Sequence, residues 1–116
     1  MLSPNPLLKS KTCLVIGGGS IAPGWGIGRA ISFAYAREGA RVAVADLNLE
    51  SAQETADLIR NDGGDARAFA VDVTDDSSIV AMVRKVESDL GPVDVLHNNV
   101  GRSNEGSVAI GAWRSG

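Results

Sequence analysis

The feature that most constrains the fold is a glycine-dense stretch between a short apolar run and an apolar helical pattern, within residues 14–34. The apolar run is Leu14, Val15 and Ile16, and the glycines that follow it are Gly17, Gly18, Gly19, Gly24, Gly26 and Gly28. Glycine permits sharp turns and lets a ligand come close to the backbone. The free N–H groups in the first turn of a helix favour an anion. The stretch therefore predicts a strand, a phosphate-binding loop and a helix in succession.

The start of this helix can be placed in two ways. Gly17-x-Gly19-x-x-Ala22 fits a general dinucleotide-binding pattern, but Pro23 and Gly24 then fall where the helix should be running. A start near Gly26 instead puts four apolar residues on one face, namely Ile27, Ala30, Ile31 and Ala34. We prefer this later start, which makes the loop about five residues longer than the minimal pattern. An ordinary glycine-rich turn remains the alternative at this stage.

The rest of the chain alternates between predicted strands and predicted helices. Strands are expected at residues 12–16, 41–45, 66–71 and 93–96. Helices are expected from about Gly26 to Glu38, from an Asn48 cap to about Asn61, and from a Thr74 or Asp75 cap to Leu90. This order predicts an α/β fold, a Rossmann-like three-layer α/β/α arrangement with a parallel sheet in strand order 3-2-1-4. A ligand is expected at the carboxyl ends of strands 1, 2 and 4.

Composition excludes several classes of function. The 116-residue chain carries a formal net charge of −3 and no basic run, so no nucleic-acid partner is expected. It has neither an apolar span long enough to cross a membrane nor the residue order of a signal peptide. Cys13 is the only cysteine and His97 the only histidine, too few soft ligands for a zinc site. A cytoplasmic location is expected, with residues 1–11 as a flexible arm around Pro4 and Pro6.

Two carboxylates end predicted strands at the edge where the ligand is expected. Asp46 ends the second strand, where it can accept hydrogen bonds from an adenosine ribose and repel a 2′-phosphate, which favours NAD over NADP. Arg41 lies at the far end of that strand, poorly placed to receive a phosphate. Asp72 ends the third strand, where it could meet the adenine edge. The alternative role for both carboxylates is that of a turn or helix-capping residue.

Together these residues resemble the N-terminal half of the short-chain dehydrogenase/reductase family, over about residues 11–101. The resemblance is carried by Gly26-Ile27-Gly28, Asp46, the Asp72-Val73 pair, and Asn98-Asn99-Val100-Gly101, which is similar to the family's Asn-Asn-Ala-Gly motif. The expected cofactor-binding residues are Gly17, Gly19, Ser20, Gly26, Ile27, Gly28, Asp46, Leu47, Asp72, Val73, Asn98, Asn99, Val100 and Gly101. Two features depart from the usual pattern: Ile16 replaces the family's threonine, and residues 21–25 lengthen the loop. Ser20-Ile21-Ala22 is similar to a segment of the enoyl-reductase branch, but Gly26-Ile27-Gly28 and Asn98-Asn99-Val100-Gly101 fit the classical branch better.

The resemblance implies hydride transfer between a nicotinamide cofactor and an alcohol or carbonyl substrate. The family's acid/base is a tyrosine followed four residues later by lysine, but the only tyrosine here is Tyr35, and Gly39 stands at the lysine position. No catalytic residue is therefore assigned, and Tyr35 is interpreted as a packing residue. We expect residues 12–101 to form a partial dinucleotide-binding domain, truncated after the fourth strand, and residues 102–116 to form an irregular tail.

Three functions remain open at this point. The first is a dehydrogenase fragment that binds NAD and would act on a substrate only in a full-length form, where association into a homo-oligomer is also open. The second is a non-catalytic dinucleotide-binding or interaction module. The third is a methyltransferase-like domain for S-adenosylmethionine, which the Asn98–Gly101 segment disfavours.

Overall fold

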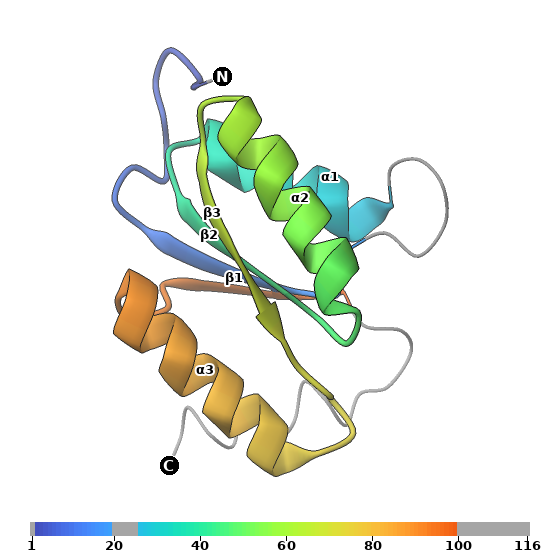
Figure 1. The fold of residues 1–116 in the computed structure, drawn as a ribbon. Helices are drawn as coiled ribbons and strands as arrows, with labels where there is room; N and C mark the ends of the chain where they lie inside the picture. Colours follow the sequence, from blue (N-terminus) through green and yellow to red (C-terminus); the bar gives the residue numbers. More distant parts are fainter. Residues whose placement is uncertain (1, 20–25, 100–116) are drawn as a thin grey trace.

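The fold is a parallel sheet between two helical layers, seen in a computed structural model that describes residues 2–19 and 26–99 (Figure 1). The elements are β1 (Thr12–Ile16), α1 (Ile27–Arg37), β2 (Arg41–Asp46), α2 (Leu49–Asn61), β3 (Asp65–Ala70), α3 (Asp76–Leu90) and β4 (Val95–Asn98). The strand order is β3-β2-β1-β4, and every pairing is parallel. Both the predicted fold class and the predicted strand order are confirmed.

α1 begins where the later of its two predicted starts places it, and α2 and α3 begin after predicted capping residues. Gly26 is the residue before α1, and its backbone is extended. The Asn48 side chain accepts a hydrogen bond from the Ser51 N–H at 3.1 Å, which caps α2. Of the two candidates for α3, Asp75 is the cap, and it accepts from the Ser77 N–H at 2.9 Å.

Two predicted strands have boundaries that were wrong by one or two residues. β3 starts and ends one residue earlier than expected. β4 starts at Val95 instead of at Val93, because the Val93 N–H donates to the Glu87 carboxylate at 3.0 Å and so closes the end of α3. β4 then continues to Asn98, which pairs with Ile16.

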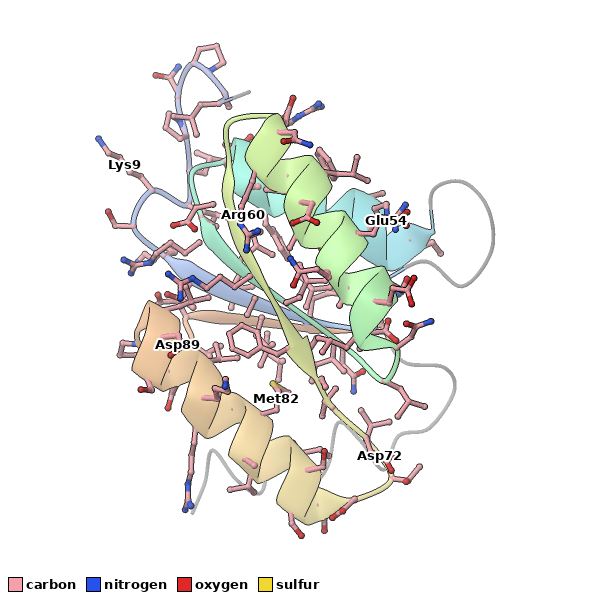
Figure 2. The ribbon with its side chains drawn as sticks, viewed as in Figure 1. Lys9, Glu54, Arg60, Asp72, Met82 and Asp89 are labelled. Atoms are coloured by element: carbon pink, nitrogen blue, oxygen red, sulfur yellow. The ribbon has the colours of Figure 1, made fainter. Side chains whose placement is uncertain are left out.

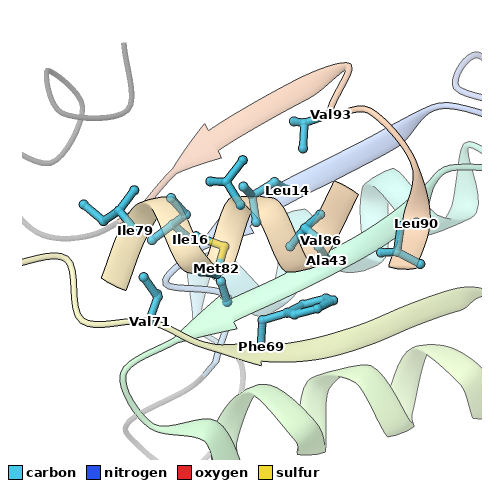
Figure 3. Close-up of a cluster of buried hydrophobic side chains, with 12 residues drawn as sticks. Leu14, Ile16, Ala43, Phe69, Val71, Ile79, Met82, Val86, Leu90 and Val93 are labelled. Atoms are coloured by element: carbon cyan, nitrogen blue, oxygen red, sulfur yellow. The ribbon is translucent and has the colours of Figure 1, made fainter. Parts of the chain in front are cut away.

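Alternate residues of each strand face different helices, which produces two separate cores. Figure 3 shows the core beneath α3, where Phe69 and Met82 pack among Leu14, Ile16, Ile79 and other apolar side chains. On the opposite face of the sheet lie α1 and α2 (Figure 1). The buried cluster on that side includes Cys13, Val15, Val42 and Val44. Because both faces are covered, all five residues of β1 are buried.

The N-terminal segment lies against the end of α1. The Ser3 N–H donates to the Arg37 carbonyl at 2.7 Å and the Leu8 N–H to the Glu38 carbonyl at 2.7 Å. The Leu7 N–H donates to the Glu38 carboxylate at 3.0 Å. These hydrogen bonds join the N-terminal segment to the C-terminal end of α1. The flexibility expected for residues 1–11 stays a prediction. Within residues 2–19 and 26–99, no helix has the length and apolar character needed to cross a bilayer.

Candidate functional site

The glycine loop begins at the carboxyl end of β1, next to the ends of β2 and β4. Gly17 has a φ of +83°, a backbone conformation that side chains disfavour. Its N–H donates to the Ala45 carbonyl of β2 at 2.7 Å, and on the other side the Asn99 N–H donates to the Ile16 carbonyl at 2.8 Å. The loop is thus anchored at the point where the chain order reverses across the sheet, as expected for a ligand site in this architecture.

Gly28 allows α1 to pack directly on this loop. A Cβ atom at residue 28 would lie 2.0 Å from the Gly17 carbonyl oxygen, so no other residue fits without a backbone shift. Gly26 supplies no side-chain cap to the first turn of α1, which leaves the N–H groups of that turn to be satisfied from outside the helix. Such a terminus suits a phosphate.

Asp46 turns its carboxylate toward the loop. Oδ2 accepts a hydrogen bond from the Gly19 N–H at 3.0 Å, and Oδ1 accepts one from the Asn48 N–H at 3.0 Å. Each oxygen of an ionised carboxylate has a second acceptor position, so ribose hydroxyls could still be bound. A Cβ at Gly19 would lie 2.6 Å from Ser51 Oγ and 2.9 Å from Ser51 Cβ, so a side chain there would require the loop or Ser51 to shift. Leu47, the next predicted site residue, is exposed.

Asp72 is engaged in a turn that leads into α3. Its Oδ1 accepts from the Thr74 hydroxyl at 2.6 Å and from the Thr74 N–H at 3.0 Å, and its own N–H donates to Ser78 Oγ at 2.9 Å. The Thr74 hydroxyl, followed by the Thr74 N–H, holds the pKa of the Asp72 carboxyl below its ordinary value. Asp72 therefore has the alternative role, that of a turn residue, and its contact with adenine stays a prediction. Val73 packs against the core beneath α3.

Ile27, the first residue of α1, is exposed. The other predicted site residues divide into two groups. Asn98 and Asn99 are half-buried and hold the end of β4 beside β1 through backbone pairing. Ser20, Val100 and Gly101 lie outside the described residues, as do the loop residues 21–25. Tyr35, interpreted from sequence as a packing residue, lies edge-on to the His97 ring with the ring centres 6.4 Å apart.

A buried polar pair behind the loop was missed by the sequence analysis. Arg29 on α1 is 6% exposed and Thr55 on α2 is fully buried. Arg29 Nε donates to Thr55 Oγ1 at 2.9 Å, and Thr55 Oγ1 donates to the Gly18 carbonyl at 3.1 Å. The signal was present, because Thr55 falls on the same helical face as Ala52 and Ile59 and therefore had to be buried.

Comparison with known proteins gives the family. The sequence model for short chain dehydrogenases matches residues 11–112. The chain belongs to this family. It is 48% identical over 92 residues to a sorbitol dehydrogenase of Cereibacter sphaeroides, covering 79% of this chain and 33% of that protein. It is 43% identical over 94 residues to a D-threitol dehydrogenase of Mycolicibacterium smegmatis, covering 81% of this chain and 34% of that protein.

Solved structures agree with this assignment. A hydroxysteroid dehydrogenase from Escherichia coli superposes with a TM-score of 0.75 at 35% identity, over 84% of this chain and 40% of that one. An NAD-bound structure from Haemophilus influenza, described as a D-mannonate oxidoreductase, gives a TM-score of 0.74 at 29% identity, over 84% of this chain and 33% of that one. The chain spans about a third of the length of the curated relatives it matches.

Among the described residues, no group of three His, Cys, Asp or Glu side chains is placed to hold a metal ion. What the described residues do provide is a loop, a helix N-terminus and a carboxylate at one edge of the sheet. Such a set has the chemistry that suits a nucleotide phosphate and ribose, and it contains no acid/base pair of the kind expected from the resemblance.

Proposed function

We propose that the chain is the NAD-binding part of an oxidoreductase that moves a hydride between a nicotinamide and an alcohol or carbonyl substrate. One observation carries the proposal. The Asp46 carboxylate faces the glycine loop and bonds to the Gly19 N–H, so that a diphosphate site and a ribose site adjoin.

The cofactor's parts fit the chemistry of these residues. Backbone N–H groups at the start of α1 suit the diphosphate, and no side chain at Gly28 stands between loop and helix. A carboxylate at Asp46 accepts from ribose hydroxyls and repels a 2′-phosphate, which favours NAD. Arg41 is at the opposite end of β2 and does not offset this charge. The NAD-bound relative supports the same choice.

The contribution of this chain to the reaction is binding and orientation. The bound nicotinamide would supply the hydride acceptor or donor. Tyr35 lies within α1 and packs against His97, so it is not proposed as the acid/base. Reaction with a substrate, and assembly into a homo-oligomer, are proposed for a longer form of the protein. A cytoplasmic location is proposed with it, since the single cysteine, Cys13, is buried and unpaired by any disulfide.

The proposal is tested by calorimetric titration of the 116-residue chain with NAD, NADP and S-adenosylmethionine. We expect NAD to bind more tightly than NADP and S-adenosylmethionine not to bind. Asp46→Ala should reduce the ratio of NADP Kd to NAD Kd by about tenfold, since it removes both the ribose acceptor and the repulsion.

Asp89→Ala is the matched control, because it removes an exposed carboxylate from α3 on the opposite face of the sheet (Figure 2). It should leave both dissociation constants unchanged. A parent chain that binds NADP as tightly as NAD would contradict the cofactor preference. A parent chain that binds neither would contradict the proposed function.

A further inference from the structure

The buried Arg29–Thr55 pair does more than fill space behind the loop. Thr55 Oγ1 bonds both to Arg29 Nε, at 2.9 Å, and to the Gly18 carbonyl, at 3.1 Å. The outer end of Arg29 forms an ion pair with Glu54 at 3.0 Å, and Glu54 lies on α2, labelled in Figure 2, with its carboxylate largely exposed. The network therefore runs from the surface of α2 to the backbone of the glycine loop.

The direction of each hydrogen bond in this network is fixed by chemistry. Arg29 Nε can only donate, so Thr55 Oγ1 must accept from it. Thr55 has a single hydroxyl hydrogen, and the Gly18 carbonyl can only accept it. A donor that is itself charged strengthens the next bond in such a chain.

The far side of the same peptide reaches the cofactor-selecting carboxylate. In a trans peptide the carbonyl and the N–H point in opposite directions. Thr55 holds the carbonyl of the Gly18–Gly19 peptide, and the Gly19 N–H donates to Asp46 Oδ2 at 3.0 Å. The peptide plane is thus held at both ends, by Thr55 behind the loop and by Asp46 in front of it.

We propose that Arg29 and Thr55 are positioning residues for cofactor selection, which aim the Asp46 carboxylate through the Gly18–Gly19 peptide. This inference rests on the proposed function. Without the Thr55 hydroxyl the peptide can rotate, the Gly19 N–H no longer fixes Asp46, and both the ribose contact and the repulsion of a 2′-phosphate weaken.

A purely structural role would affect stability without affecting cofactor choice, and the chain offers a matched control. Thr12 is also fully buried, and its hydroxyl donates to the Leu90 carbonyl at 2.9 Å, at the amino end of β1. Thr12→Val and Thr55→Val each remove one buried hydroxyl that donates to a backbone carbonyl. Only Thr55→Val should alter the nucleotide site.

The experiment measures Kd for NAD and for NADP by calorimetry on the 116-residue chain and its variants. Thr55→Val should raise the NAD Kd about fivefold to tenfold and lower the preference for NAD over NADP. Thr55→Ser should restore both values, because it returns the hydroxyl. Arg29→Lys, which keeps the charge but lacks the Nε donor, should fall between them, and Glu54→Gln should change neither value more than about twofold.

A second measurement needs no cofactor. In ¹H–¹⁵N spectra of the ligand-free chain, Thr55→Val should shift the Gly19 amide resonance and speed its hydrogen exchange, whereas Thr12→Val should do neither. If the parent binds NAD and Thr55→Val has the same ratio of NADP Kd to NAD Kd as the parent, the positioning role is overturned and the proposed function is not. An unchanged Gly19 amide in Thr55→Val overturns it as well. If the parent binds no NAD, the proposed function fails and the role with it.

Discussion

The two faces of the sheet differ in the size and polarity of their buried side chains. Beneath α3 the buried side chains are apolar apart from Thr12, whose hydroxyl donates to the Leu90 carbonyl, and several are bulky, including Phe69, Met82 and Leu90. Beneath α1 and α2 the core is formed largely by alanine and valine. Of the buried polar residues in the part of the chain that the structure describes, all except Thr12 belong to α1 or α2: Arg29, Ser32, Ser51 and Thr55.

Under the proposed function, this difference would separate the residues that stabilise the domain from those that support binding. Large apolar side chains contribute most of the burial free energy, and they gather on the face away from the loop. Small side chains let α1 and α2 approach the sheet closely. Of the buried hydroxyls on this face, Thr55 Oγ1 donates to the loop backbone at the Gly18 carbonyl, and Ser32 Oγ donates to the Gly28 carbonyl within α1. Substitutions on the α3 face should therefore change folding, and those on the other face should also change binding.

The largest expected effect is on the α3 face. Phe69→Ala should lower the free energy of unfolding by about 3–5 kcal/mol through lost burial and the cavity left behind. The NAD Kd of the molecules that remain folded should not change. Urea denaturation followed by circular dichroism measures the first quantity and calorimetry the second. Phe69→Leu replaces Phe69→Ala if the alanine variant does not fold. A tenfold change in the NAD Kd of Phe69→Leu would contradict the idea that the α3 face affects stability without affecting binding.

The next effect concerns the contact between α1 and the loop. Gly28→Ala should weaken NAD binding by more than about tenfold, because the new Cβ displaces the loop or the helix at the phosphate site. Gly63→Ala is the comparison, since Gly63 has a φ of +91° but no atom within 4 Å of an added Cβ. It should cost about 1–2 kcal/mol of stability through backbone strain and leave binding intact. Equal loss of NAD affinity in both variants would show that the contact at Gly28 has no special role.

The smallest effect is a pH dependence that arises on the α1 and α2 face. Burial, followed by the nearby negative charge of Asp94, raises the pKa of the Cys13 thiol from its ordinary 9.0 to about 11. Folding thus favours the protonated thiol, and the stability it contributes is fully present below pH 9 and is lost as pH rises from 9 through 11. Cys13→Ala should show a shallower decline of stability over that interval in thermal melts. Identical declines in the two proteins would contradict the assigned cause.

The sequence predicted most of the fold because its strands and helices carry the periodicity that their burial requires. The run at β1 is apolar throughout since both its faces are covered, and the stripe on α3 marks a single covered face. The start of β4 was wrong because a side chain, Glu87, bonds to the Val93 N–H, and no periodicity reports such a contact.

Local patterns predicted the candidate site less completely. The place of Asp46 beside the glycine loop could be predicted, because a carboxylate at a strand end next to a glycine loop is a local pattern. The link from Arg29 to Thr55 depends on how two helices lie against one another, which a pattern along one helix does not contain. For Asp72 the sequence allowed either a contact with adenine or a role in a turn, and its hydrogen bonds to Thr74 are visible only in the structure.

The most direct test of the central claim is an NAD titration of the ¹⁵N-labelled chain followed through its backbone amides. We predict saturable shifts at Gly17, Gly18 and Gly19, at Gly28, and at Asp46 and Asn48, with the amides of α3 unchanged. Shifts confined to α3, or no saturable shift at the loop and Asp46, would contradict the claim that this edge of the sheet holds a dinucleotide.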